Sequence, residues 1–266
     1  MAAICVIPAR FSSTRFPGKI VASDTGKPLV QHVVEQAKAA RRISDVIVAV
    51  DDQRIVDALA SYGTRCVMTS PRHLSGTDRV AEVAQSLSES LGEPLGESLS
   101  ESIIVNVQGD EPEIEPQTID ALVERLEKGE GDMATAATPF ADGDDPDDPN
   151  LVKVVISLSG NALYFSRSRI PFERDQAESS RPAYYLHQGI YAYRREFLLE
   201  LASWPPTPLE MTEKLEQLRV LEHGRSIDVI LTRRAVHGID TPQQYREFVR
   251  RYQRGAAAEA GAINHE

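Results

Sequence analysis

The chain has 266 residues, of which 41% are hydrophobic and 26% are charged, as is ordinary for a globular protein. Its formal net charge of -11 argues against broad nucleic-acid binding, which needs a basic face. The sequence has no apolar run of about 18 residues and no basic start, so we expect no membrane insertion, no signal peptide and a cytoplasmic location. Cys5 and Cys66 are expected to be buried thiols in a reducing compartment.

Strand and helix patterns alternate through the first half of the chain. Apolar runs rich in β-branched residues predict strands at 3–8, 45–52, 64–69 and 102–108. Helical spacing of apolar residues predicts helices at 28–43, 53–63 and 77–87. This alternation predicts an α/β fold with a mostly parallel, twisted sheet and helices on both of its faces.

The second half reads differently. Runs rich in β-branched and aromatic residues predict strands at 151–157, 162–171 and 184–193, which we expect to form a smaller mixed β extension. Further predicted elements are an amphipathic helix at 208–224, a strand at 227–232 and a capped helix at 241–252. We therefore expect one domain over 1–254, with a β-rich subdomain at about 151–223 and a frayed tail at 255–266.

The segment "IPARFSSTRFPGK", residues 7–19, follows the first predicted strand and gathers Arg10, Arg15 and Lys19 in an acidic chain. Ligands of open α/β sheets bind at the carboxyl ends of the strands. The guanidinium group of an arginine can donate two parallel hydrogen bonds to phosphate oxygens, and a lysine supplies a compact positive charge. The loop matches neither GxxxxGK[ST] nor GxGxxG. Two interpretations of these charges are equally consistent with the sequence. The loop could be a solvated basic loop on the surface, or it could bind a nucleoside triphosphate.

Two acidic segments are candidate metal ligands. "VQGDEP" places Gln108 and Asp110 just beyond a predicted strand, where a carboxylate can hold Mg²⁺ on phosphates, although Asp and Gly are also common in turns. "GIDTPQQY" places Asp240 directly before a helix whose Thr241 and Gln244 fit a capping box. From the residues alone, Asp240 could equally serve that cap.

Candidate ligand contacts also lie in three other segments. "SGTDR" offers Ser75 and Arg79 at a helix start, either as an anion site or as an ordinary cap. "HQGIYAY" contains His187, which in a strand is more often structural. "LEQLRV" contains Glu216 and Gln217, which also fit the polar face of an amphipathic helix.

These motifs, in this order from residue 4 to about residue 252, resemble those of the 3-deoxy-manno-octulosonate (KDO) cytidylyltransferases, the CMP-KDO synthetase family. The loop reads Ser13-Thr14-Arg15, whereas sialic-acid-activating relatives usually have Gly-Ser-Lys. The sequence departs from the family pattern at residues 70–72 and at Leu186. The resemblance implies a Rossmann-like nucleotidyltransferase fold, CTP and KDO as substrates, Mg²⁺ as cofactor, a homodimer and a role in lipopolysaccharide synthesis.

The resemblance also implies roles for individual residues. Nucleotide contacts are expected at Ala9, Arg10, Arg15, Lys19 and Ser75. Sugar contacts are expected at Arg79, Gln108, His187, Tyr191, Glu216 and Gln217. Asp110 and Asp240 are the expected metal ligands. Lys19, Asp110 and Arg15 are expected to carry catalysis.

The implied reaction is attack of the anomeric hydroxyl of the sugar on the α-phosphorus of CTP, with release of pyrophosphate. It needs positioning and charge stabilisation but no covalent enzyme intermediate. One alternative is a related acidic sugar, such as an 8-amino-KDO or a nonulosonate. An alternative of another class is a catalytically silent nucleotide-binding module. The aromatic strand at 162–171 is the expected dimer surface.

Overall fold

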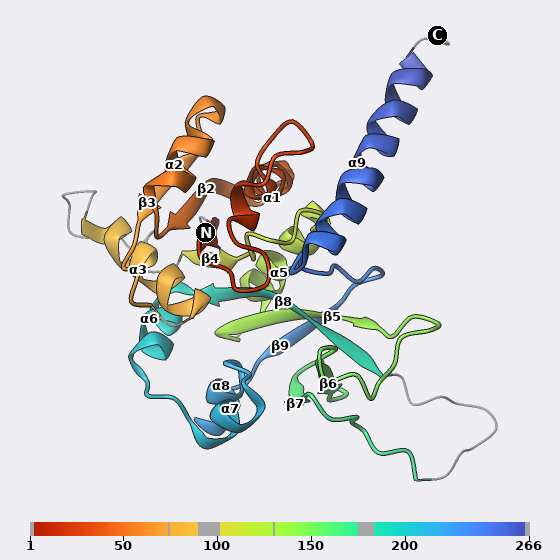
Figure 1. Ribbon diagram of the computed structural model, residues 1–266. Helices are drawn as coiled ribbons and strands as arrows, with labels where there is room; N and C mark the ends of the chain where they lie inside the picture. Colours follow the sequence, from red (N-terminus) through yellow and green to blue (C-terminus); the bar gives the residue numbers. More distant parts are fainter. Residues whose placement is uncertain (1–2, 74, 90–101, 130, 175–183, 264–266) are drawn as a thin grey trace.

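The computed structural model describes residues 3–73, 75–89, 102–129, 131–174 and 184–263, with side chains described except at 88–89 and 256–263 (Figure 1). Within these ranges nine strands form one sheet. The strands are β1 (Ala3–Ala9), β2 (Ile43–Val50), β3 (Arg65–Met68), β4 (Ile103–Asn106), β5 (Met133–Pro139), β6 (Lys153–Ile156), β7 (Ala162–Ser166), β8 (Tyr185–Arg194) and β9 (Asp228–Leu231). The α-helices are α1 (Leu29–Ala39), α2 (Gln53–Leu59), α3 (Gly76–Glu89), α5 (Pro116–Lys128), α6 (Arg195–Ser203), α7 (Pro208–Glu213), α8 (Leu218–Glu222) and α9 (Pro242–Ile263).

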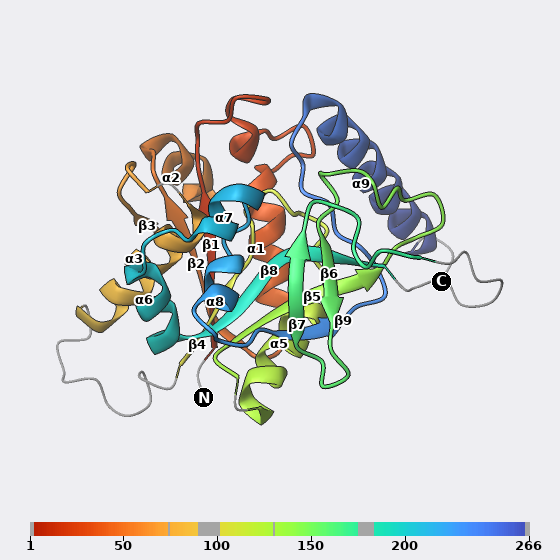
Figure 2. The same ribbon diagram turned by 90° about the horizontal axis from the view of Figure 1, so that it is seen from below.

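The sheet runs in the order β3-β2-β1-β4-β8-β5-β9, with β6 and β7 beside β8. Strands β3, β2, β1 and β4 are all parallel neighbours, which confirms the parallel sheet predicted for the first half. Strand β8 pairs antiparallel with both β4 and β5. The mixed extension is therefore joined to the parallel part through β8, and only the β6–β7 hairpin lies off the main path (Figure 2).

Helices cover both faces of the sheet because its strands are apolar on both sides. Cys5 and Ile7 of β1 belong to one buried cluster with residues of α1, α2 and α5. Val6 points the other way, into a second cluster with residues of α3, α6 and α8. Alternating side chains of a strand reach opposite faces, so a continuous apolar run is what a sheet covered on both sides requires.

Several elements differ from the sequence-based expectation. The predicted helix at 208–224 is two helices, α7 and α8, because Lys214 adopts a left-handed conformation with φ 56°. Helix α9 runs from Pro242 to Ile263 and so extends beyond the helix predicted at 241–252. Helix α5 and strand β5 were not predicted. The low-complexity segment after α3 lies at 90–101, outside the described residues.

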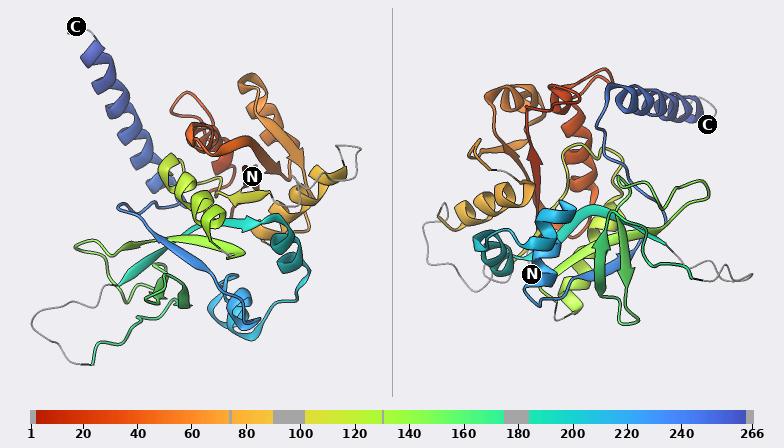
Figure 3. Two further views of the ribbon diagram at one scale, coloured as in Figure 1. Left: turned by 180° about the vertical axis from the view of Figure 1, so that it is seen from behind. Right: turned by 60° about the horizontal axis from the view of Figure 1, so that its bottom comes forward.

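Helix α9 projects from the body of the molecule, with its first turn against the loop at residues 10–19 (the phosphate loop) and its far end in the open (Figures 1 and 3). Apolar packing holds its first turns against the body of the protein, because Tyr245 and Phe248 form a small buried cluster with Leu29 and Ile239. The hydroxyl of Tyr245 accepts a hydrogen bond from the backbone N–H of Asp24 at 2.8 Å. No helix in the described part of the chain is long and apolar enough to span a membrane.

Candidate active site

The carboxyl ends of β1 and β4 form the edge at which the phosphate loop and the first acidic segment meet. The loop from Arg10 to Lys19 follows β1 directly, residues 107–111 follow β4, and a pocket of about 440 Å³ lies between them. Gly109 is required here, because a Cβ at this position would lie 2.8 Å from the carbonyl oxygen of Pro8. The predicted residues that line this nucleotide pocket are Arg10, Arg15, Lys19, Ser75, Gln108, Asp110 and Glu216.

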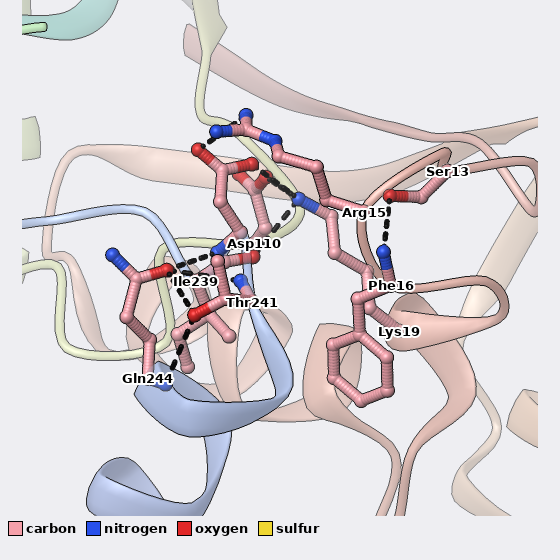
Figure 4. Close-up of polar contacts among 9 residues, drawn as sticks. Ser13, Arg15, Phe16, Lys19, Asp110, Ile239, Thr241 and Gln244 are labelled. Atoms are coloured by element: carbon pink, nitrogen blue, oxygen red, sulfur yellow. Dashed lines mark hydrogen bonds and ion pairs between the residues drawn. The ribbon is translucent and has the colours of Figure 1, made fainter.

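Lys19 is the centre of this edge (Figure 4). Its buried ammonium group donates hydrogen bonds to Asp110 Oδ2 at 2.5 Å, to Asp240 Oδ1 at 3.0 Å and to the Ile239 carbonyl at 2.9 Å. Arg15 pairs with the other oxygen of Asp240 at 2.9 Å. Two carboxylates far apart in sequence are thus brought together, as the family resemblance implied.

The charge of Lys19 is secured by these contacts. Burial by itself lowers the pKa of an ammonium group, but the carboxylates of Asp110 and Asp240 outweigh it and raise the pKa of Lys19 above its ordinary value. Lys19 is therefore a cation throughout the physiological pH range. Its ammonium group lies where it can exchange its hydrogen bonds with the carboxylates for hydrogen bonds with the oxygens of an incoming phosphate.

The backbone on each side of this centre is tied down. The N–H of Ile239 donates to the carbonyl of Asp110 at 2.9 Å, which joins the two acidic segments. At the start of α9, the side-chain oxygen of Gln244 accepts the N–H groups of Asp240 and Thr241, both at 2.9 Å (Figure 4). The Thr241 hydroxyl accepts the N–H of Gln244 at 3.2 Å, so the predicted capping box is present.

The donor set fits Mg²⁺. This cation is bound through one or two carboxylates together with phosphate oxygens and water. The side chains of Asp110 and Asp240 are 25% and 40% exposed, and both reach the same ammonium group. No group of three or more His, Cys, Asp or Glu side chains suited to a metal occurs in the described part of the chain. The remaining ligands would therefore come from the substrate and from water.

A second pocket of about 240 Å³ adjoins the nucleotide pocket and shares Gly76, Gln108 and Glu216 with it. Glu216 and Gln217 reach it because the chain turns inward between α7 and α8. Burial raises the pKa of Glu216, although hydrogen bonds with Thr77 and Ser75 oppose the shift. Buried Gln217 has no hydrogen-bond partner for its Nε2 atom among the described residues.

A third pocket of about 300 Å³ continues from the second, with which it shares Gly189, Tyr191, Leu215 and Gln217. It is also lined by His187, which packs edge-on against Phe165, and by Leu186, the residue that departs from the family pattern. Burial lowers the pKa of His187 to about 3, so the ring is neutral near pH 7.

The tautomer of His187 follows from its neighbour. Its Nε2 lies 3.0 Å from the hydroxyl of Thr135, and that hydroxyl lies 2.8 Å from the carbonyl of Ile190. Because a carbonyl can only accept, the single hydroxyl proton goes to Ile190, and Nε2 must donate to Thr135. The other ring nitrogen, Nδ1, is left as a hydrogen-bond acceptor.

Two predicted contacts lie elsewhere. Arg79 is fully buried and lines none of the three pockets. Its guanidinium bonds the hydroxyl of Thr69 and lies 3.4 Å from Asp51, whose other oxygen accepts the N–H of Phe11 at 3.0 Å. The structure does not bring Arg79 to these pockets, because its side chain turns toward the ends of β2 and β3; the sugar contact expected of it stays a prediction. Ala9 ends β1, and its methyl group belongs to the core.

One functional candidate was not predicted. Glu111, next to Asp110, is 8% exposed and lines the third pocket. Burial, with a smaller contribution from the charge of Asp110, raises the pKa of Glu111 to about 8. The sequence gives little warning, since an acidic residue between Asp and Pro looks like a solvated turn.

The fold and the paired carboxylates around Lys19 define a nucleotide-binding α/β protein, and comparisons with known proteins specify which kind. The profile of the cytidylyltransferase family matches residues 4–227. The 3-deoxy-manno-octulosonate cytidylyltransferase of Geobacter sulfurreducens is 47% identical over 253 residues, covering 92% of this chain and 96% of that protein. That of Geotalea daltonii is 49% identical over 246 residues, covering 89% and 92%.

A solved structure agrees with these relatives. The structure of CMP:2-keto-3-deoxy-manno-octonic acid synthetase complexed with CTP has a TM-score of 0.85 and 35% identity, covering 96% of this chain and all of that chain. The chain belongs to the cytidylyltransferase family.

Proposed function

We propose that this protein transfers CMP from CTP to the anomeric hydroxyl of KDO and releases pyrophosphate, so that the sugar is activated for lipopolysaccharide synthesis. The observation that carries the proposal is the Lys19 centre, where one ammonium group joins two carboxylates at the mouth of pockets lined with hydrogen-bonding groups. The names of the curated relatives and of the solved neighbour support the choice of CTP and KDO.

In the proposed mechanism Arg10 and Arg15 hold the triphosphate, and Lys19 neutralises charge that develops on its phosphate oxygens. Asp110 and Asp240 are the residues that would hold Mg²⁺. When bound, the metal supplies charge neutralisation at the phosphates and a lowered pKa for the attacking hydroxyl. The sugar oxygen forms a bond to the α-phosphorus while the bond from that phosphorus to the β-phosphate oxygen breaks. The hydroxyl proton leaves to solvent, and pyrophosphate departs.

The sugar is proposed to lie in the second and third pockets. Glu216 and Gln217, from the turn between α7 and α8, would bind its hydroxyl groups together with Gln108 and Tyr191. The unpartnered Nε2 of Gln217 supports this, because a buried amide without a hydrogen bond is costly unless a ligand supplies one. Neutral His187 would accept a hydrogen bond through Nδ1.

A cytoplasmic homodimer is part of the proposal. Strand β7 forms a ladder only with β6 among the described strands; on its other edge the N–H of Ala162 donates to the carbonyl of Ile227 at 2.9 Å, and further along the strand Leu163 is 61% exposed. An open edge with an apolar side chain favours pairing with a second copy. Light scattering after size-exclusion chromatography would give twice the chain mass; a monomer at every concentration would contradict it.

The substrate is tested by measuring pyrophosphate release from CTP with KDO, 8-amino-KDO or a sialic acid, each at a range of Mg²⁺ concentrations. We expect release with KDO at a kcat/KM at least tenfold above the other two. Preference for another acidic sugar would keep the chemistry and replace the substrate. Absence of release with all three, from a protein that still binds CTP, would favour a silent nucleotide-binding module.

A further inference from the structure

Glu111 presents a buried carboxyl group that the proposed mechanism does not use. It is 8% exposed, and its side chain makes no hydrogen bond or ion pair with any residue that the structure describes. Its backbone is ordinary, with the N–H donating to the carbonyl of Gln108 at 3.2 Å. Its oxygen atoms are not fully enclosed and the residue lines the third pocket, so a ligand in that pocket can supply hydrogen bonds to them.

Two glycines lie beside this carboxyl. A Cβ on Gly189 would lie 3.5 Å from Glu111 Oε1, and a Cβ on Gly238 would lie 3.7 Å from Asp110 Oδ1 and 3.9 Å from Glu111 Cγ, all of them ordinary van der Waals distances. Both glycines line the third pocket together with Glu111.

The lining of the third pocket selects a chemical class of ligand. None of the described residues that line it is Lys or Arg, which would hold a carboxylate or a phosphate, although His237 lines it as well. It does offer the Glu111 carboxyl, the Nδ1 acceptor of His187 and the unpartnered amide of Gln217. Acceptors and a donor without a fixed charge of the opposite sign are suited to hydroxyl groups.

The position of this pocket agrees with the shape of the proposed sugar. An octulosonate closed into a six-membered ring keeps two hydroxyl-bearing carbons outside the ring, on the ring carbon that shares the ring oxygen with the anomeric carbon. The nucleotide pocket adjoins the second pocket through Gln108 and Glu216. The third pocket adjoins the second through Tyr191 and Gln217, and its Glu111 directly follows Asp110 of the nucleotide pocket, so it lies within reach of a chain that starts close to the anomeric carbon.

We propose that Glu111 binds the two-carbon hydroxylated chain of the sugar in the third pocket, with His187 and Gln217 completing the subsite. The assignment rests on the proposed function. It makes Glu111 a specificity residue that distinguishes acidic sugars by the chain they carry. It acts on the sugar directly and not through its neighbour Asp110.

The test compares two forms of the enzyme on two substrates, in the manner of a double-mutant cycle. Glu111→Ala and wild type are compared with KDO and with a six-carbon 3-deoxy-2-ketoaldonate that lacks the chain. With KDO, Glu111→Ala should raise KM about tenfold or more, since a buried acceptor is lost. With the short sugar the two enzymes should agree within about twofold, because the contact is absent in both. KM for CTP and the half-saturating Mg²⁺ concentration should not change.

Two further variants control the experiment. Glu113→Ala, two residues along the same loop, removes a carboxylate that pairs with Arg251 at the surface, and should leave both sugars unaffected. Glu111→Asp withdraws the carboxyl by one methylene and should repeat the selective loss for KDO, which keeps the test decisive if Glu111→Ala does not fold.

The outcomes separate the two proposals. Equal losses for both sugars, or a matching rise in the Mg²⁺ requirement, would overturn the subsite, because Glu111 would then act through Asp110 or through the fold. Wild-type protein that turns over the short sugar as well as KDO would also overturn it. Wild-type protein that turns over neither would overturn the proposed function first, and the subsite with it.

Discussion

The nucleotide end and the sugar end of the proposed site differ in whether their polar groups already have partners. At the nucleotide end, charged groups already pair with one another: Lys19 holds Asp110 and Asp240, and Arg15 holds Asp240. At the sugar end the groups are buried and neutral or unpartnered, as with His187 and the amide of Gln217. Charged pairs keep the first end organised before a ligand arrives, whereas the second end leaves its hydrogen bonds for the ligand to complete.

The largest effect that this contrast predicts is at Asp110. Asp110→Asn removes one of the two carboxylates that Lys19 joins and one proposed ligand of the metal. We expect kcat to fall about 100-fold or more, within the range seen when one electrostatic contact to a transition state is lost. Circular dichroism should show a folded protein. Asp57→Asn, which alters an exposed carboxylate on α2, serves as the control; near-normal turnover by Asp110→Asn would remove this residue from the mechanism.

A smaller effect is expected from a substitution at Gln244, which contacts neither a substrate nor the metal in the proposed mechanism. Gln244→Ala frees the N–H groups of Asp240 and Thr241, so the second carboxylate loses its fixed backbone. We expect the half-saturating Mg²⁺ concentration to rise about fivefold, equivalent to about 1 kcal/mol for a lost cap. Binding of Mn²⁺ in the presence of CTP, followed by electron paramagnetic resonance, should weaken equally.

The chain offers matched controls for Gln244. Gln243→Ala changes the same residue type one position away and breaks only an exposed contact with Glu247. Gln244→Glu keeps an oxygen that can accept both N–H groups and should restore metal binding. If Gln243→Ala weakens Mn²⁺ binding as much as Gln244→Ala does, the effect belongs to the helix and not to the cap.

Raising the salt concentration should change the measured constants less than either substitution does. It should nevertheless separate the two ends most clearly, because we expect KM for CTP to respond and KM for the sugar to stay nearly constant. Raising KCl from about 0.1 to 0.5 M shortens the distance over which exposed charges act. Arg15 and Asp240 have side chains that are 63% and 40% exposed, so KM for CTP should rise severalfold. KM for the sugar should stay within about twofold, because its pockets rely on buried hydrogen bonds. Parallel increases in both constants would refute the division.

The nucleotide end was predictable because its residues are unusual where they stand. Three cations in one loop of an acidic chain, and carboxylates after a strand and before a capped helix, point to the same edge of a sheet. The pairing of Asp110 with Asp240 needed the family resemblance, since spacing along the chain says nothing about contact across it.

The sugar end was harder to predict for physical reasons. The helical pattern at 208–224 conceals the left-handed Lys214, whose break turns Glu216 and Gln217 inward. The direction in which Arg79 points depends on how α3 sits on the sheet, which periodicity does not fix. Glu111 looks like a turn residue until the fold buries it.

The central claim is that CTP is attacked at its α-phosphorus by the sugar. Phosphorus-31 nuclear magnetic resonance of CTP, KDO and Mg²⁺ with the protein tests it most directly. The account predicts a sugar-linked CMP phosphodiester and pyrophosphate in equal amounts, at rates that depend on Lys19. Unchanged CTP, or CDP together with inorganic phosphate, would contradict it.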